Sequence, residues 1–170
     1  MRANNAARIL EYVKGQESEL IRITRALVEA ESPSAVPECH DEVRRVLRLA
    51  LAEVGYDSRE SGAPDKPRHI FAVPANRRRG RPSQLLLGHY DTVWPIGTLG
   101  ERPFSVDGNI LRGPGSFDMK AGLAQIVVAL GAARALDLLL PVVPVVFVNA
   151  DEEIGSRSST RYIRWLAEHA

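Results

Sequence analysis

The segment from Pro141 to Val148 constrains the fold more than any other part of the chain. It reads Pro-Val-Val-Pro-Val-Val-Phe-Val and is apolar without alternation. A strand with one buried face alternates apolar and polar residues, whereas a strand covered on both faces is apolar throughout. We therefore expect a central strand here, in a sheet with helices on both sides. This arrangement is typical of an α/β sandwich.

Helical and extended patterns alternate along the rest of the chain. Apolar residues at helical spacing predict helices that include residues 6–13, 20–28, 37–54, 119–136 and 158–170. Short β-rich runs predict strands at residues 69–73 and 84–90, and a hairpin over residues 104–111. Strands that alternate with helices support the α/β class.

The composition excludes several classes of function. Lys and Arg number 22 and Asp and Glu 21, a net charge of +1, which removes the electrostatic argument for a nucleic-acid or anionic membrane surface. The single cysteine, Cys39, cannot form an internal disulfide. The N-terminus lacks the apolar region of a signal peptide, and the apolar run over 138–148 is too short to cross a bilayer. We expect a cytoplasmic protein with no nucleic-acid or membrane partner, in which the arginines at 77–79 form a solvated turn.

A histidine and an aspartate stand at the end of the strand predicted at residues 84–90. His89 and Asp91 are two residues apart, so in extended backbone their side chains point the same way. A carboxylate beside a histidine accepts its free ring N–H and raises its basicity as a metal ligand. The alternative is a surface histidine and a turn aspartate, and the pair alone leaves both open.

A glycine-rich segment leads to Asp118 at the start of the helix predicted over 119–136. One interpretation of Asp118 is a helix N-cap, a position that aspartate favours. The glycines Gly113 and Gly115 also let the backbone approach another segment closely, which an N-cap does not require. The spacing matches neither a dinucleotide-binding glycine motif nor a P-loop, so a phosphate cradle is not expected.

Three adjacent carboxylates, Asp151, Glu152 and Glu153, follow the central strand directly. Such neighbours repel one another and resist desolvation, and a cation among them would relieve that cost. A solvated acidic loop is the alternative. The sequence lacks the motifs of other hydrolytic sites, because it has no G-x-S-x-G, no H-E-x-x-H and no second cysteine. The remaining histidines are expected to be solvated or packing residues: His40, His69 and His169.

Taken together and in this order, the three clusters resemble the motifs of the M20 family of zinc-dependent aminoacylases and carboxypeptidases. The matching segments are residues 88–93, 113–122 and 151–156. Their spacings also fit the family, with 118 − 89 = 29 and 153 − 118 = 35 residues between the candidate ligands. The chain departs from the pattern at Ala121, where the family often has glycine.

The resemblance implies a fold and a set of roles. The fold is a zinc-exopeptidase-like catalytic domain, a three-layer α/β sandwich with a mixed, mostly parallel sheet. His89 would bind one zinc ion, Asp118 would bridge two, and Glu153 would bind the second, with Co²⁺ or Mn²⁺ as possible substitutes. Glu152 would be the general base and Asp91 the partner of His89. The peptide bond between Asp118 and Met119 is expected to be cis.

The resemblance also implies a substrate class and a larger assembly. The expected activity is cleavage of an amide bond in a peptide or an N-acyl amino acid. Residues 94–99 and 103–104 most resemble the glutamate-carboxypeptidase-like branch, with deacylases and desuccinylases as alternatives within the family. In the family, two further zinc ligands and a lid and dimerisation domain follow the Glu-Glu motif. We therefore expect residues 1–170 to be the N-terminal part of one catalytic domain, inactive alone, and the full-length form to be a homodimer.

Two hypotheses from other classes stand beside this one. The chain is either an inactive remnant that at most binds a metal or a partner, or a generic flavodoxin-like binding domain. The second would leave the ordered spacing of the three acidic clusters unexplained.

Overall fold

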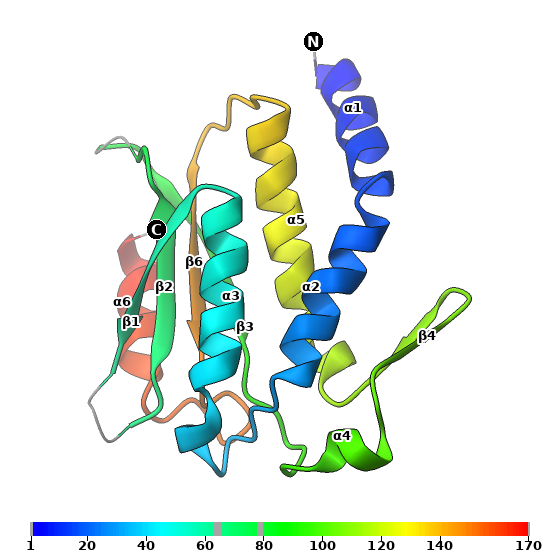
Figure 1. Cartoon of the computed structure of the whole chain (residues 1–170). Coiled ribbons are helices and arrows are strands. Elements are labelled where there is room, and N and C mark those ends of the chain that lie inside the picture. Colours follow the sequence, from blue (N-terminus) through cyan, green and yellow to red (C-terminus); the bar gives the residue numbers. More distant parts are fainter. Residues whose placement is uncertain (1, 63–65, 78–79, 170) are drawn as a thin grey trace.

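In the computed structural model, which describes residues 2–62, 66–77 and 80–169, helices cover both faces of a four-stranded sheet (Figure 1). The helices are α1 (Arg2–Lys14), α2 (Glu17–Glu29), α3 (Asp41–Glu53), α4 (Thr98–Glu101), α5 (Ala121–Ala135) and α6 (Thr160–His169), with short helical turns η1 (Pro37–Cys39) and η2 (Ser116–Lys120). The strands are β1 (Tyr56–Ser61), β2 (His69–Pro74), β3 (Ser83–His89), β4 (Ser105–Asp107), β5 (Ile110–Arg112) and β6 (Val143–Asn149).

The main sheet is mixed, with strand order β1-β2-β6-β3. β6 runs parallel to β3, and β2 runs antiparallel to both of its neighbours, so three of the four strands point the same way. The expected mixed α/β fold is confirmed. The apolar segment forms the inner strand β6, in which Val145 to Val148 are all buried.

The core lies between the sheet and the helices α2, α3 and α5, and α6 covers the opposite face (Figure 1). On the core side, alternate residues of β2 and β6 meet apolar side chains of the three helices: Leu27, Leu47, Leu51, Ile70, Leu123, Val127, Val146 and Val148. On the α6 side, Phe147 packs against Tyr162 with ring centroids 6.1 Å apart. β6 is therefore covered on both faces, which is why its sequence does not alternate.

The stretch Ser116–Ala135 is long and apolar enough, by composition alone, to cross a membrane. A core helix passes the same test, because a helix packed on several sides is apolar all round. α5 packs in this way against the sheet and α2, with Leu123, Ala124 and Val127 buried.

β1 is absent from the strands that the sequence predicts. It reads Tyr-Asp-Ser-Arg-Glu-Ser, lies at the edge of the sheet, and buries only Tyr56 fully. Charged residues on an edge strand oppose pairing with other chains, and they also remove the apolar alternation by which strands are found. Residues 78 and 79 of the predicted arginine-rich turn lie outside the described residues.

Candidate metal centre

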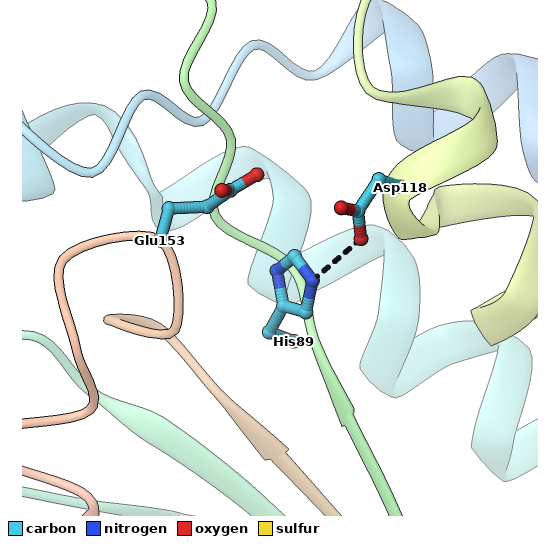
Figure 2. Close-up of side chains that lie close together, drawn as sticks. All are labelled: His89, Asp118 and Glu153. Atoms are coloured by element: carbon cyan, nitrogen blue, oxygen red, sulfur yellow. Dashed lines mark hydrogen bonds and ion pairs between the residues drawn. The ribbon is translucent and has the colours of Figure 1, made fainter.

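His89, Asp118 and Glu153 come together at one edge of the sheet, although 153 − 89 = 64 residues separate the outer two. One ligand atom from each lies within 4.8 Å of the others. Figure 2 shows the three side chains converging, with a hydrogen bond of 3.0 Å between His89 Nε2 and Asp118 Oδ1. The predicted convergence is confirmed.

The parallel pairing of β3 with β6 brings His89 and Glu153 to the same place. His89 is in register with Asn149, so the loops that follow the two strands leave the sheet side by side. The carboxyl ends of parallel strands are the usual location of sites in open α/β sheets.

Asp118 reaches this edge through a close contact between two loops. Gly115 has a φ of +67°, and a Cβ on it would lie 2.5 Å from Thr92 Cγ2. Only glycine permits this approach. Asp118 itself has non-helical φ and ψ of −123° and 102° within η2, and its peptide bond to Met119 is cis. α5 begins at Ala121, so the N-cap interpretation of Asp118 is wrong, and its carboxylate faces His89 instead.

The ring of His89 is held with Nε2 toward the cluster. Its Nδ1 lies 3.0 Å from the backbone oxygen of Asp91 and 3.4 Å from Asp91 Oδ1. Burial lowers the pKa of His89, but hydrogen bonds with Asp91 and Asp118 outweigh it and raise the pKa to about 9. A metal ion that binds at Nε2 therefore displaces a proton.

Asp91 is fully buried and connects the two strand-end loops. It accepts hydrogen bonds from the Ser34 hydroxyl at 2.7 Å and from the backbone N–H groups of Glu152 and Glu153 at 3.2 Å each. Burial raises the pKa of Asp91, but hydrogen bonds with His89 and Ser34 hold it below its usual value. The sequence predicts the partnership with His89 but not the contacts with Ser34 and the glutamates, since nothing in the local sequence signals them.

The three adjacent carboxylates have separate environments. Asp151 is buried and accepts hydrogen bonds from the backbone and hydroxyl groups of Ser158 and Ser159. The expectation of a cation among all three is therefore wrong for Asp151, because serines satisfy it. Glu152 is half-exposed, and its Oε2 lies 3.8 Å from His89 Nε2.

Only Glu153 of the three joins the candidate ligand group. Burial raises the pKa of Glu153, and the nearby charge of Asp118 raises it further. A cation would relieve this repulsion. One imidazole nitrogen and two carboxylate oxygens form a donor set that suits zinc, cobalt or manganese.

Residues 85–170, just over half of the chain, match the model of peptidase family M20/M25/M40. The chain belongs to this family. Carboxypeptidase G2 of Pseudomonas sp. (strain RS-16) is 28% identical over 162 residues, which cover 95% of this chain and 39% of that protein. Acetylornithine deacetylase of Klebsiella pneumoniae (strain 342) is 33% identical over 157 residues, which cover 88% of this chain and 40% of that protein.

Solved structures share the M20 fold. Human carnosine dipeptidase 1 aligns with a TM-score of 0.75 at 21% sequence identity, over 92% of this chain and 37% of that one. The chain spans about two fifths of the length of the curated relatives that it matches.

Two further histidines of this M20 chain are packing residues, as the sequence predicts. His69 is fully buried, accepts the N–H of Ala150 at Nδ1 and contacts Ser158 Oγ at 3.2 Å through Nε2. His40 is also fully buried, and its Nε2 lies 2.8 Å from the backbone oxygen of Pro33. Burial lowers the pKa of both rings.

Proposed function

We propose that this chain supplies metal ligands and a proton-transfer group to a metal-dependent hydrolase that cleaves the amide bond of a peptide or an N-acyl amino acid. The observation that carries the proposal is the convergence of His89, Asp118 and Glu153, with Glu152 beside them. One curated relative is a carboxypeptidase and the other a deacetylase, which supports both substrate classes.

We assign the ligand roles from the donor atoms. His89 would hold one zinc ion, Glu153 would hold a second, and Asp118 would hold both, as the M20 resemblance implies. Asp91 would keep His89 Nε2 directed at the metal. When bound, a pair of such ions polarises an amide carbonyl and lowers the pKa of a water molecule.

Glu152 is the proposed general base. Its half-exposed carboxylate lies close to the metal-facing nitrogen of His89, at 3.8 Å, without being part of the ligand group. From there it would accept a proton from the attacking water at an Oε atom and return it to the nitrogen of the leaving amine. The full-length form is proposed to be a cytoplasmic homodimer, of which residues 1–170 are the N-terminal part of one catalytic domain.

Zinc titration of this chain by calorimetry tests the ligand assignment. We expect zinc binding that Glu153→Gln weakens by at least about tenfold, since it removes a charged ligand. The matched control is Glu11→Gln, an exposed glutamate on α1, which should leave binding unchanged. Equal zinc binding by the parent and by Glu153→Gln would contradict the assignment and favour a structural role for the cluster.

A further inference from the structure

A pocket of about 400 Å³ opens among the loops that carry the candidate metal centre. Its lining includes Trp94, Arg102, Arg112 and Pro114. The proposed hydrolytic roles use none of these residues.

The two loops that line the pocket also lead to the residues of the metal centre. Trp94 follows Asp91 by three residues, and Pro114 precedes Asp118 by four. Between the two sites the loops touch, because Gly115 lies against Thr92 with room for no Cβ. Figure 1 shows α4 beyond the end of β3 and the hairpin that carries β4 projecting to one side of it. The pocket is therefore built on the same two loops as His89 and Asp118.

The loop that carries Trp94 and Arg102 is held in place by the rest of the fold. The carboxylate of Glu31 accepts the backbone N–H of Gly97 at 2.9 Å and that of Leu99 at 3.2 Å. Within the loop, the hydroxyl of Thr98 donates to the backbone oxygen of Pro95 at 2.6 Å. A wall that is ordered in advance costs a ligand little entropy on binding.

The pocket carries positive charge that the fold leaves largely unneutralised. The guanidinium of Arg102 lies over the ring of Trp94, 5.3 Å from its centroid, and within the described part of the chain no carboxylate forms an ion pair with it. Among the residues that the structure describes, Arg112 reaches one carboxylate oxygen, of Asp107, at 4.0 Å, and both side chains are largely exposed. By contrast, arginines on the helices, such as Arg22 and Arg45, form close pairs with carboxylates.

We propose that this pocket binds a carboxylate group of the substrate, through Arg102 and Arg112, with Trp94 as its apolar wall. The inference rests on the proposed hydrolase function and names the charge of the substrate. A guanidinium donates two parallel N–H groups to the two oxygens of a carboxylate, and a cation held over an aromatic face keeps its edge donors free. The carboxylate is either the α-carboxylate or an acidic side chain, which present the same chemistry.

Fluorescence of Trp94 in the metal-free chain tests the inference. The chain has two tryptophans, so Trp165→Phe leaves Trp94 as the only indole. The probes are N-acetyl-glutamine, N-acetyl-isoglutamine and N-acetyl-glutaminamide, which carry an α-carboxylate, a side-chain carboxylate and no carboxylate. We expect a saturable change with at least one of the first two, and none with the third. Arg102→Gln should weaken the binding by about tenfold or more.

The control variant is Arg45→Gln, an exposed arginine on α3 that should not affect the titration. Circular dichroism checks that each variant folds. If Arg102→Gln does not fold, Arg112→Gln takes its place as the test. The probe that binds identifies which carboxylate the pocket accepts. Equal binding of all three probes, no saturable change with any of them, or full binding by both arginine variants would overturn the inference. Because no metal is present, these results do not depend on the zinc titration that tests the proposed function.

Discussion

Asp91 is the residue on which the candidate site depends most, since one buried carboxylate contacts both strand-end loops. Asp91→Asn replaces one acceptor oxygen with an amide that faces donors. We expect the free energy of unfolding to fall by about 3–5 kcal/mol in urea denaturation, and zinc affinity to fall about 10–100-fold. Ser34→Ala, which removes one hydrogen bond to Asp91, should cost only about 1–2 kcal/mol. Unchanged zinc affinity in folded Asp91→Asn would contradict this role.

Glu152 and Glu153 are expected to have different roles although they are neighbours. In a form of the protein that turns over substrate, Glu152→Gln should retain zinc and lose about 10²–10⁴-fold in kcat, the range for removal of a general base. Glu153→Gln should instead lose metal. Metal analysis after dialysis, combined with an activity assay, separates the two effects. Equal zinc loss in the two variants would refute the division.

The buried histidines predict how stability depends on pH. Burial holds the pKa values of His40 and His69 below the ordinary 6.5, so below pH 6.5 the unfolded chain binds more protons and stability falls as the pH drops. His89 has its pKa raised to about 9, so its contribution is complete below 6.5 and is lost as the pH rises toward 9. We expect an acid limb in urea denaturation, in which stability falls below pH 6.5 by up to about 1.4 kcal/mol per pH unit for each of His40 and His69. Between pH 7 and 9 the loss from His89 is opposed by Lys120, whose pKa burial lowers to about 7, so that its contribution to stability grows over the same range.

His40→Gln isolates one part of this profile. Glutamine preserves an N–H donor for the backbone oxygen of Pro33 and has no titrating group. The variant should flatten the acid limb between pH 5 and 6.5 and leave the profile above pH 7 unchanged. An unaltered acid limb would show that His40 is protonated equally in the folded and unfolded chains.

At the scale of elements, Lys120 joins the metal-site turn η2 to the end of α2. Its buried Nζ donates to the backbone oxygens of Leu27 at 2.7 Å and Ala30 at 2.8 Å, which lie at a helix end where carbonyls lack intrahelical partners. Burial lowers the pKa of Lys120 to about 7, and an uncharged amine still has two hydrogens for these carbonyls. Lys120→Met should therefore lower the free energy of unfolding by about 2–4 kcal/mol in urea denaturation.

The exposed residue Lys14, at the end of α1, provides the control for this prediction. Lys14→Met should change stability by less than about 0.5 kcal/mol. Similar effects of the two substitutions would show that the buried hydrogen bonds of Lys120 do not stabilise the fold.

The sequence predicts an element when the residues that determine it are close together in the chain. β6 is recognisable because eight consecutive residues carry its pattern, whereas β1 is polar and takes its conformation from pairing with β2. The regular start predicted for the helix at Met119 was wrong by two residues, because Asp118 and Met119 adopt non-helical angles beside the loop of Thr92.

The same reasoning applies to the candidate site. His89, Asp118 and Glu153 were predictable because each lies near a recognisable element and because their three ordered motifs resemble those of the M20 family. The partners of Asp91 and Asp151 were not, because Ser34 lies 57 residues from Asp91, and the serines that bind Asp151 follow it by seven and eight residues.

At the scale of the whole molecule, the number of ligands limits what this chain binds. Closed zinc sites have four ligands and catalytic sites at least three for each ion, whereas the described residues bring together one group of three. We expect residues 1–170 to retain fewer than two tightly bound zinc ions and to hydrolyse neither N-acyl amino acids nor dipeptides. Elemental analysis and an amino-acid release assay measure both. Two tight zinc ions together with turnover would contradict this prediction.

The position of β6 has a consequence for how the protein is made. β2 and β3 are consecutive strands in the sequence, yet β6 lies between them in the sheet. While the chain is being synthesised, β2 and β3 therefore have no native pairing with each other, and the sheet stays open until residues 143–149 arrive. Such long-range pairing is the slow kind of folding event. His89 leaves the ribosome 64 residues before Glu153, so the three metal ligands come together only after β6 has been made and the middle of the sheet closes.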